Sequence, residues 1–206
     1  MRRPLPLALA LACACGDAPR ESRTAARAAA IALQPRMPAP HVRQIGEGKT
    51  WLLRAPVVYR AGTGDSLVVP AGYVAEFGGV PRWFHPYLVP AEPHAGPAVV
   101  HDYLYWTRRC TRAEADGVFR RAMLEQGVPD SVVAQLHAAA GSWAGTAWRT
   151  YERDRGAGLP RFVPATARPD GSLESWPRYR AYLRDSARAP EPPVVASAGL
   201  CALGRG

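Results

Sequence analysis

One segment near the middle of the chain is apolar around almost the whole circumference that a helix would present. At about 100° per residue, the apolar side chains of residues 97–108 cover most sides: Val99, Val100, Tyr103, Leu104 and Trp106. The exception is a polar stripe with His101, Asp102 and Tyr105. A helix of this kind is normally buried. The polar stripe is therefore expected to be buried too, or to open into a cleft.

A buried carboxyl group needs a partner, because an isolated one costs several kcal/mol or takes up a proton. The next segment offers that partner. Thr111 and Glu114 have capping-box spacing, which predicts a second helix from Thr111 to about Gly127. The short link between the two helices makes them antiparallel neighbours. Asp116 is then expected to reach the imidazole of His101.

A carboxylate bonded to one nitrogen of a histidine fixes the tautomer and raises the basicity of the other nitrogen. This is the arrangement of a histidine general base. We therefore expect His101, Asp116 and Tyr105 to be catalytic, with Tyr105 holding the carboxylate. The predicted function is a hydrolase-like cleft that cleaves an ester or acyl bond with water activated by His101. Zinc held by His85, His94 and His101 is an alternative, although their spacing matches no common pattern.

The surrounding sequence predicts an α+β fold. Short β-rich runs at residues 51–53, 57–59, 67–69 and 73–77 alternate with Gly- and Pro-containing turns and indicate a small antiparallel β-meander. Three helices follow, the third at about residues 130–151. Together these elements form a compact domain at residues 49–151.

The flanks of this domain are rich in Pro, Gly, Ala and Arg. We expect a tether at residues 16–48. Residues 152–188 are expected to form a Pro-rich connector that contains a short helix. The last segment, residues 189–206, is expected to be a disordered tail. The chain thus has flexible extensions on both sides of one domain.

Residues 1–15 resemble a secretory signal. A basic start is followed by an apolar run and by Ala12-Cys13-Ala14, an A-x-A end. The run is shorter than the roughly 20 residues of a transmembrane helix. Small residues before Cys15, or before Cys13, are also typical of a lipoprotein signal. The expected location is outside the cytoplasm, with or without a lipid tether, and the alternative is the cytoplasm.

The net charge of +9 is spread over many arginines without a Lys/Arg-rich run of five. Nucleic acid is therefore not an expected partner, whereas an anionic surface or lipid stays open. Beyond the signal segment the cysteines are Cys110 and Cys201. An exported chain could pair them, although spacing alone leaves this open.

Three separated motifs occur in order: residues 69–82 (VPAGYVAEFGGVPR), 98–105 (AVVHDYLY) and the pattern E-A-D-x-x-F at 114–119. Together they resemble the bacterial and phage family catalogued as domain of unknown function 1353, over about residues 66–150. The family usually has Asp at the position of Glu76 and Ser near Gly79. The name of the family implies no activity, so a second, non-enzymatic hypothesis stays open. In that hypothesis the chain is a non-enzymatic, phage-derived structural or cell-surface module, and the cluster is a structural polar network.

The pattern His-Asp-x-x-Tyr on one helix and Asp-x-x-Phe on the next also resembles secreted phospholipases of the A-two type. This resemblance implies that His101 is the base, Asp102 a calcium ligand, Asp116 the orienting carboxylate and Tyr105 its support. Calcium needs 6–8 oxygens, so backbone carbonyls of residues 77–80 would have to contribute. The chain departs from those enzymes because it has no cysteines beside His101.

Overall fold

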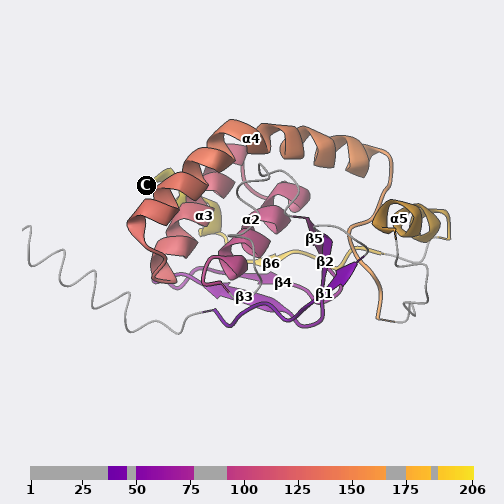
Figure 1. Cartoon of the computed structure of the whole chain (residues 1–206), viewed down its shortest axis with the longest axis horizontal. Helices are drawn as coiled ribbons and strands as arrows, with labels where there is room; N and C mark the ends of the chain where they lie inside the picture. The colour runs from indigo at the N-terminus through magenta and orange to yellow at the C-terminus, as the bar shows by residue number, and fades with distance from the viewer. Residues whose placement is uncertain (1–36, 46–49, 77–91, 166–174, 187–189) are drawn as a thin grey trace, which may run out of the picture.

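The computed structural model describes residues 37–45, 50–76, 92–165, 175–186 and 190–206. Helix α2 (Ala95–Thr107) lies between two groups of elements (Figure 1). It contacts strands β3, β4 and β5 on one side and helices α3 and α4 on the other. From Ala95 to Trp106 every residue except His101 is buried. The predicted buried helix is confirmed.

The strands form two small antiparallel sheets. One has the order β1 (Val42–Ile45), β2 (Thr50–Leu53), β5 (Val74–Glu76). The other has the order β3 (Val57–Arg60), β4 (Ser66–Val69), β6 (Val195–Ala196). The α+β class is confirmed. The predicted strands exist, but they are divided between two sheets, and each sheet gains a strand from outside the expected domain.

The helices begin largely where their sequence signals place them. Helix α3 (Arg112–Glu125) starts at a capping box in which the Thr111 hydroxyl accepts from the Glu114 N–H at 3.3 Å. The Glu114 carboxylate accepts from the Thr111 N–H at 2.9 Å. Helix α4 (Asp130–Gly156) continues past the expected end near residue 151. Helix α5 (Trp176–Asp185) is the short helix expected in the connector.

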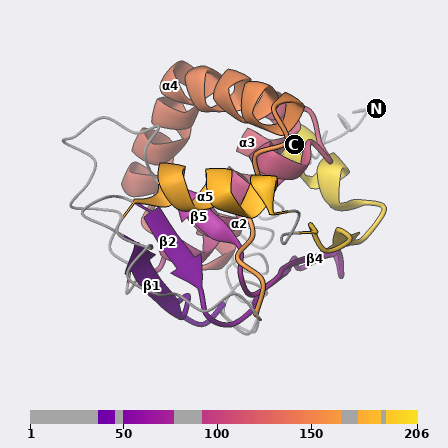
Figure 2. The same cartoon turned by 90° about the vertical axis from the view of Figure 1, so that its right-hand side faces the viewer.

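The connector is part of the folded body. The N–H of Val74 donates to the carbonyl of Arg161 at 2.9 Å, and the N–H of Val163 donates to Gly72 at 2.8 Å. Helix α5 lies across the β1-β2-β5 sheet (Figure 2). It buries Trp176 and Leu183 against apolar residues of that sheet. Burial of this apolar surface gives the connector its fixed place.

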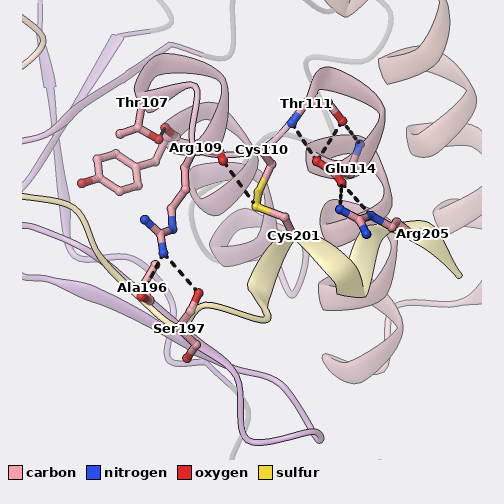
Figure 3. Close-up of a disulfide and its surroundings, with 10 residues drawn as sticks. Thr107, Arg109, Cys110, Thr111, Glu114, Ala196, Ser197, Cys201 and Arg205 are labelled. Carbon is pink, nitrogen blue, oxygen red and sulfur yellow. Dashed lines mark hydrogen bonds and ion pairs between the residues drawn. A yellow bond between two sulfur atoms is a disulfide. The ribbon is translucent and has the colours of Figure 1, made fainter.

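The tail does not match its prediction. Residues 190–206 were expected to be disordered, yet they supply strand β6 and the 3₁₀ helix η4 (Leu200–Arg205). A disulfide joins Cys110 to Cys201 across 91 residues (Figure 3). Leu200 is fully buried, and the Arg205 guanidinium lies 2.7 Å from the Glu114 carboxylate. Composition missed this order because it depends on a covalent bond and on contacts far away in sequence.

Strand β1 corrects the predicted tether in the same way. It pairs with β2 in the register Val42 to Leu53 and Ile45 to Thr50, and Ile45 is buried. The signal-like segment 1–15, the loop at 77–80 and His85 lie outside the described residues. Within the described part of the chain, no helix combines the length and hydrophobicity needed to cross a membrane.

Candidate functional site

The side chains of His101, Tyr105 and Asp116 meet between α2 and α3. The His101 Nε2 atom lies 2.7 Å from Asp116 Oδ1, and the Tyr105 hydroxyl donates to the same oxygen at 2.5 Å. His101 and Tyr105 are four residues apart on α2 and therefore share one face. The predicted juxtaposition of these three residues is confirmed.

Aromatic and basic side chains surround this cluster. The ring of Phe119 stacks on the His101 ring at a centroid distance of 4.8 Å. Trp148 of α4 makes an edge contact with Tyr105 at 5.0 Å. The Arg112 Nη1 atom lies 4.0 Å from the second oxygen of Asp116. Three helices thus contribute to the site.

The charge state of Asp116 follows from these contacts. Burial raises the pKa of this carboxyl, but the hydrogen bond and charge of His101 act in the opposite direction, helped by Tyr105 and Arg112. The net result is a pKa below the ordinary value. Burial and the Asp116 contact raise the pKa of Tyr105, so this phenol stays protonated and donates. The cluster therefore holds an ionised carboxylate beside a neutral phenol.

An ionised carboxylate can only accept hydrogen bonds. The Nε2 atom of a neutral His101 must therefore carry the proton and donate it to Asp116. The other nitrogen, Nδ1, then has the free lone pair and no hydrogen-bond partner among the residues that the structure describes. The His101 side chain is 13% exposed. This is the protonation pattern of a histidine base.

Asp102 belongs to a different cluster, on another side of α2. Its Oδ1 accepts from the Tyr151 hydroxyl at 2.5 Å, and its Oδ2 accepts from Tyr73 at 2.8 Å. The Arg161 Nη1 atom lies 3.7 Å from Oδ2, and Nη2 of the same arginine lies 2.8 Å from the Glu76 carboxylate. Arg161 is 1% exposed. A buried cation is thus held between two carboxylates.

The residues around Asp102 do not fit a calcium ion. Burial raises the pKa of Asp102, with Arg161 and the two tyrosines acting against it. Burial lowers the pKa of Arg161, but Tyr151 and the carboxylates overcome this effect and keep the guanidinium charged. Both oxygens of Asp102 already accept hydrogen bonds from phenols, and a charged guanidinium, which would repel a cation, lies 3.7 Å from Oδ2. The role implied for Asp102 as a metal ligand does not fit these residues.

The zinc alternative stays a prediction, because His85 lies outside the described residues. His94 is buried before α2, and its Nε2 atom has no hydrogen-bond partner in the described residues. Those residues contain no group of three or more His, Cys, Asp or Glu side chains placed to hold a metal ion. We therefore derive no chemistry through a metal.

Several side chains around the two clusters were not among the predicted site residues, and they include Trp148, Tyr151 and Arg161. Trp148 and Tyr151 fit the apolar period of the third helix and were interpreted as core. Arg161 lies in the run Leu159-Pro160-Arg161-Phe162-Val163, where a single charge is flanked by apolar residues. This local pattern is the one signal in the sequence that could have indicated a buried arginine.

The fold and the site define an α+β domain in which one buried helix carries two separate acid-containing clusters. Residues 51–140 match the family described as "Protein of unknown function (DUF1353)". This match confirms the family resemblance that the three motifs predicted. The match includes His101, Tyr105 and Asp116 but ends before Tyr151 and Arg161. No curated protein and no solved structure matches the chain.

Proposed function

We propose that the protein is a hydrolase in which His101 acts as a general base on an ester or other acyl bond. One observation carries this proposal: the charged Asp116 carboxylate binds the His101 imidazole at 2.7 Å while Tyr105 fixes the same oxygen. A carboxylate held from two sides orients the ring and stabilises the imidazolium that forms during the reaction.

The proposed reaction uses the two nitrogens of His101 in different ways. Nε2–H stays bonded to Asp116, and Nδ1 takes a proton from a water molecule as the water oxygen attacks the acyl carbon. The imidazolium then gives this proton to the leaving oxygen as the acyl bond breaks. The products are a carboxylic acid and an alcohol, and the histidine returns to its neutral state. General base catalysis of this kind contributes about 10²–10⁴-fold in rate.

A second candidate function is a structural or cell-surface module, and one contact favours it. Phe119 stacks on the imidazole, which leaves little of the His101 side chain exposed. In that case the cluster is a polar network that ties α2 to α3, as the Asp102 cluster ties α2 to α4 and the β5 end of the sheet. The two candidate functions predict different effects of removing the imidazole: loss of hydrolysis for the enzyme, and loss of stability alone for the structural module.

The test uses the purified full chain with its disulfide intact, assayed on short-chain esters and phospholipid vesicles. We expect His101→Gln to abolish hydrolysis and Asp116→Asn to lower kcat by about 10²–10⁴-fold. The exposed His41 provides a matched control, since His41→Gln makes the same change away from the site and should retain full activity. A folded wild-type chain that is inert toward the panel would overturn the proposal. Loss of thermal stability in the inert variants would then favour the structural module.

We also infer that the chain is exported. The Cys110–Cys201 disulfide supports this, because such bonds persist in oxidising compartments and are rare in the cytosol. The signal-like residues 1–15 point the same way, and the charge of +9 suits an anionic surface or lipid as partner. The test is cell fractionation of bacteria that express the full chain, with mass measurement of the product. A lipid-bearing product that is lost in Cys15→Ser or Cys13→Ser shows a tether, and an unprocessed cytoplasmic product overturns export.

A further inference from the structure

Two arginines converge beside the proposed catalytic cluster at a glycine of α4. A Cβ atom placed on Gly145 would lie 3.8 Å from Arg112 Nη1 and 3.7 Å from Arg149 Nη1. The two guanidinium groups thus approach the same point from α3 and from α4. Because residue 145 has no side chain, no atom of its own fills the space between the two guanidinium groups.

The neighbouring carboxylates do not neutralise this pair. Glu114 is held by Thr111 and Arg205, and Glu152 lies 3.6 Å from Arg108. Arg149 donates only to the Thr146 hydroxyl at 3.5 Å and makes no ion pair within the described part of the chain. Within the described residues, Asp116 is the carboxylate that pairs with Arg112, at 4.0 Å. The single charge of Asp116 can offset at most one of the two arginine charges, so at least one positive charge remains uncompensated at this point.

The positions of the two guanidiniums are partly fixed. Arg112 Nη1 donates to the carbonyl of Gly141 at 3.3 Å, which holds this group against α4 one turn before Gly145. A Cβ on Gly141 would meet no atom within 4 Å, so this side of α4 is open. Planar guanidinium groups bind carboxylate and phosphate oxygens through paired hydrogen bonds.

We propose that Arg112 and Arg149 form an oxyanion-binding subsite beside His101, so that the substrate carries a single negative charge, as a carboxylate or a phosphodiester, close to the bond that is cleaved. The link to substrate rests on the proposed function; binding of the anion does not. Arg112 connects the two parts, since it lies at 4.0 Å from the carboxylate that orients His101.

The first experiment measures binding alone. Inorganic phosphate is titrated into the full chain at low salt, and the His101 ring signals are followed by NMR. We expect saturable binding that weakens at least tenfold in Arg149→Gln and in Arg112→Gln. Arg178→Gln removes an exposed arginine of α5 and should leave the affinity unchanged. Gly145→Glu places a carboxylate between the two guanidiniums and should abolish phosphate binding while the chain stays folded.

The second experiment measures selectivity on two esters that differ only in a carboxylate or phosphodiester group on the acyl chain. The ratio of kcat/KM for the anionic ester over the neutral ester should fall at least tenfold in Arg149→Gln and recover in part in Arg149→Lys. Phosphate binding by the wild-type chain, with no hydrolysis by the wild-type chain or any variant, would retain the subsite and reject the hydrolase. Phosphate that does not bind, or that binds equally to Arg149→Gln and Gly145→Glu, would overturn the subsite whatever the activity.

Discussion

The backbones of Gly117 in α3 and Gly204 in η4 are in direct contact. A Cβ atom on Gly117 would overlap the carbonyl group of Gly204, and a Cβ on Gly204 would overlap the carbonyl of Glu114. Both obstacles are backbone atoms, which no change of side-chain rotamer can move. The two glycines therefore set how closely the end of the chain lies against the helix that carries Asp116.

We predict that Gly117→Ala destabilises the protein by about 1–3 kcal/mol, as overpacking does. The sign is informative, because the same change in an unobstructed helix normally stabilises by about 0.5–1 kcal/mol. Gly141→Ala is the matched control, since nothing lies within 4 Å of its added Cβ. Urea unfolding of both variants gives the comparison. A Gly117→Ala protein that is more stable than wild type would contradict the close contact.

The disulfide should be a large part of the stability. Removing a link that spans 91 residues increases the freedom of the unfolded chain, which corresponds to about 4.6 kcal/mol in the loop-entropy model. The double variant Cys110→Ala/Cys201→Ala should unfold at a lower denaturant concentration, with a free energy of unfolding reduced by about that amount. Reductant should bring wild type to the same midpoint and leave the double variant unaffected. Equal midpoints of oxidised wild type and variant would show that the link contributes nothing.

Arg161 and Asp102 are predicted to be strongly coupled. Removing one partner of a buried charge pair typically costs about 3–5 kcal/mol, because the other charge stays buried and unpaired. We expect this loss for Arg161→Met and a similar or smaller one for Asp102→Asn, which leaves Arg161 its Glu76 contact. The double variant should lose less than the sum, with a coupling of about 1–3 kcal/mol. Additive losses in a double-mutant cycle would show that the two side chains act independently.

Stability should fall on mild acidification because of His94. Burial lowers the pKa of this imidazole from its ordinary value of 6.5, and Glu92 offsets part of the effect. Below pH 6.5 the unfolded chain therefore binds a proton that the folded chain does not, so stability is full above that pH and declines as pH falls toward the folded pKa. The Phe variant, His94→Phe, should flatten this slope in thermal melts between about pH 7 and pH 5. An unchanged slope would assign the acid sensitivity to other groups.

The sequence was sufficient to predict features whose signals are local or follow the period of a helix. The burial of α2 follows from its apolar circumference, and the meeting of His101 with Asp116 follows from a short link and a capping box. The sequence was insufficient to predict segments that are ordered by contacts with residues far away in the chain. Strand β6 is two residues long and its pairing with β4 spans more than a hundred positions, so composition alone gave no indication of it. The resemblance to phospholipases implied a metal role for Asp102, and the sequence did not reveal its partner Arg161, which lies in a segment interpreted as a connector.

The pairing of β6 with β4 and the Cys110–Cys201 link also have a consequence for the order of events during synthesis. The second sheet cannot be completed, nor the bond closed, until translation has passed residue 201. The segment that matches the family, residues 51–140, would emerge with β4 as an unpaired edge and without the arginine that neutralises Asp102. The second sheet of this protein therefore reaches its final form only after residues more than a hundred positions beyond β4 have been made.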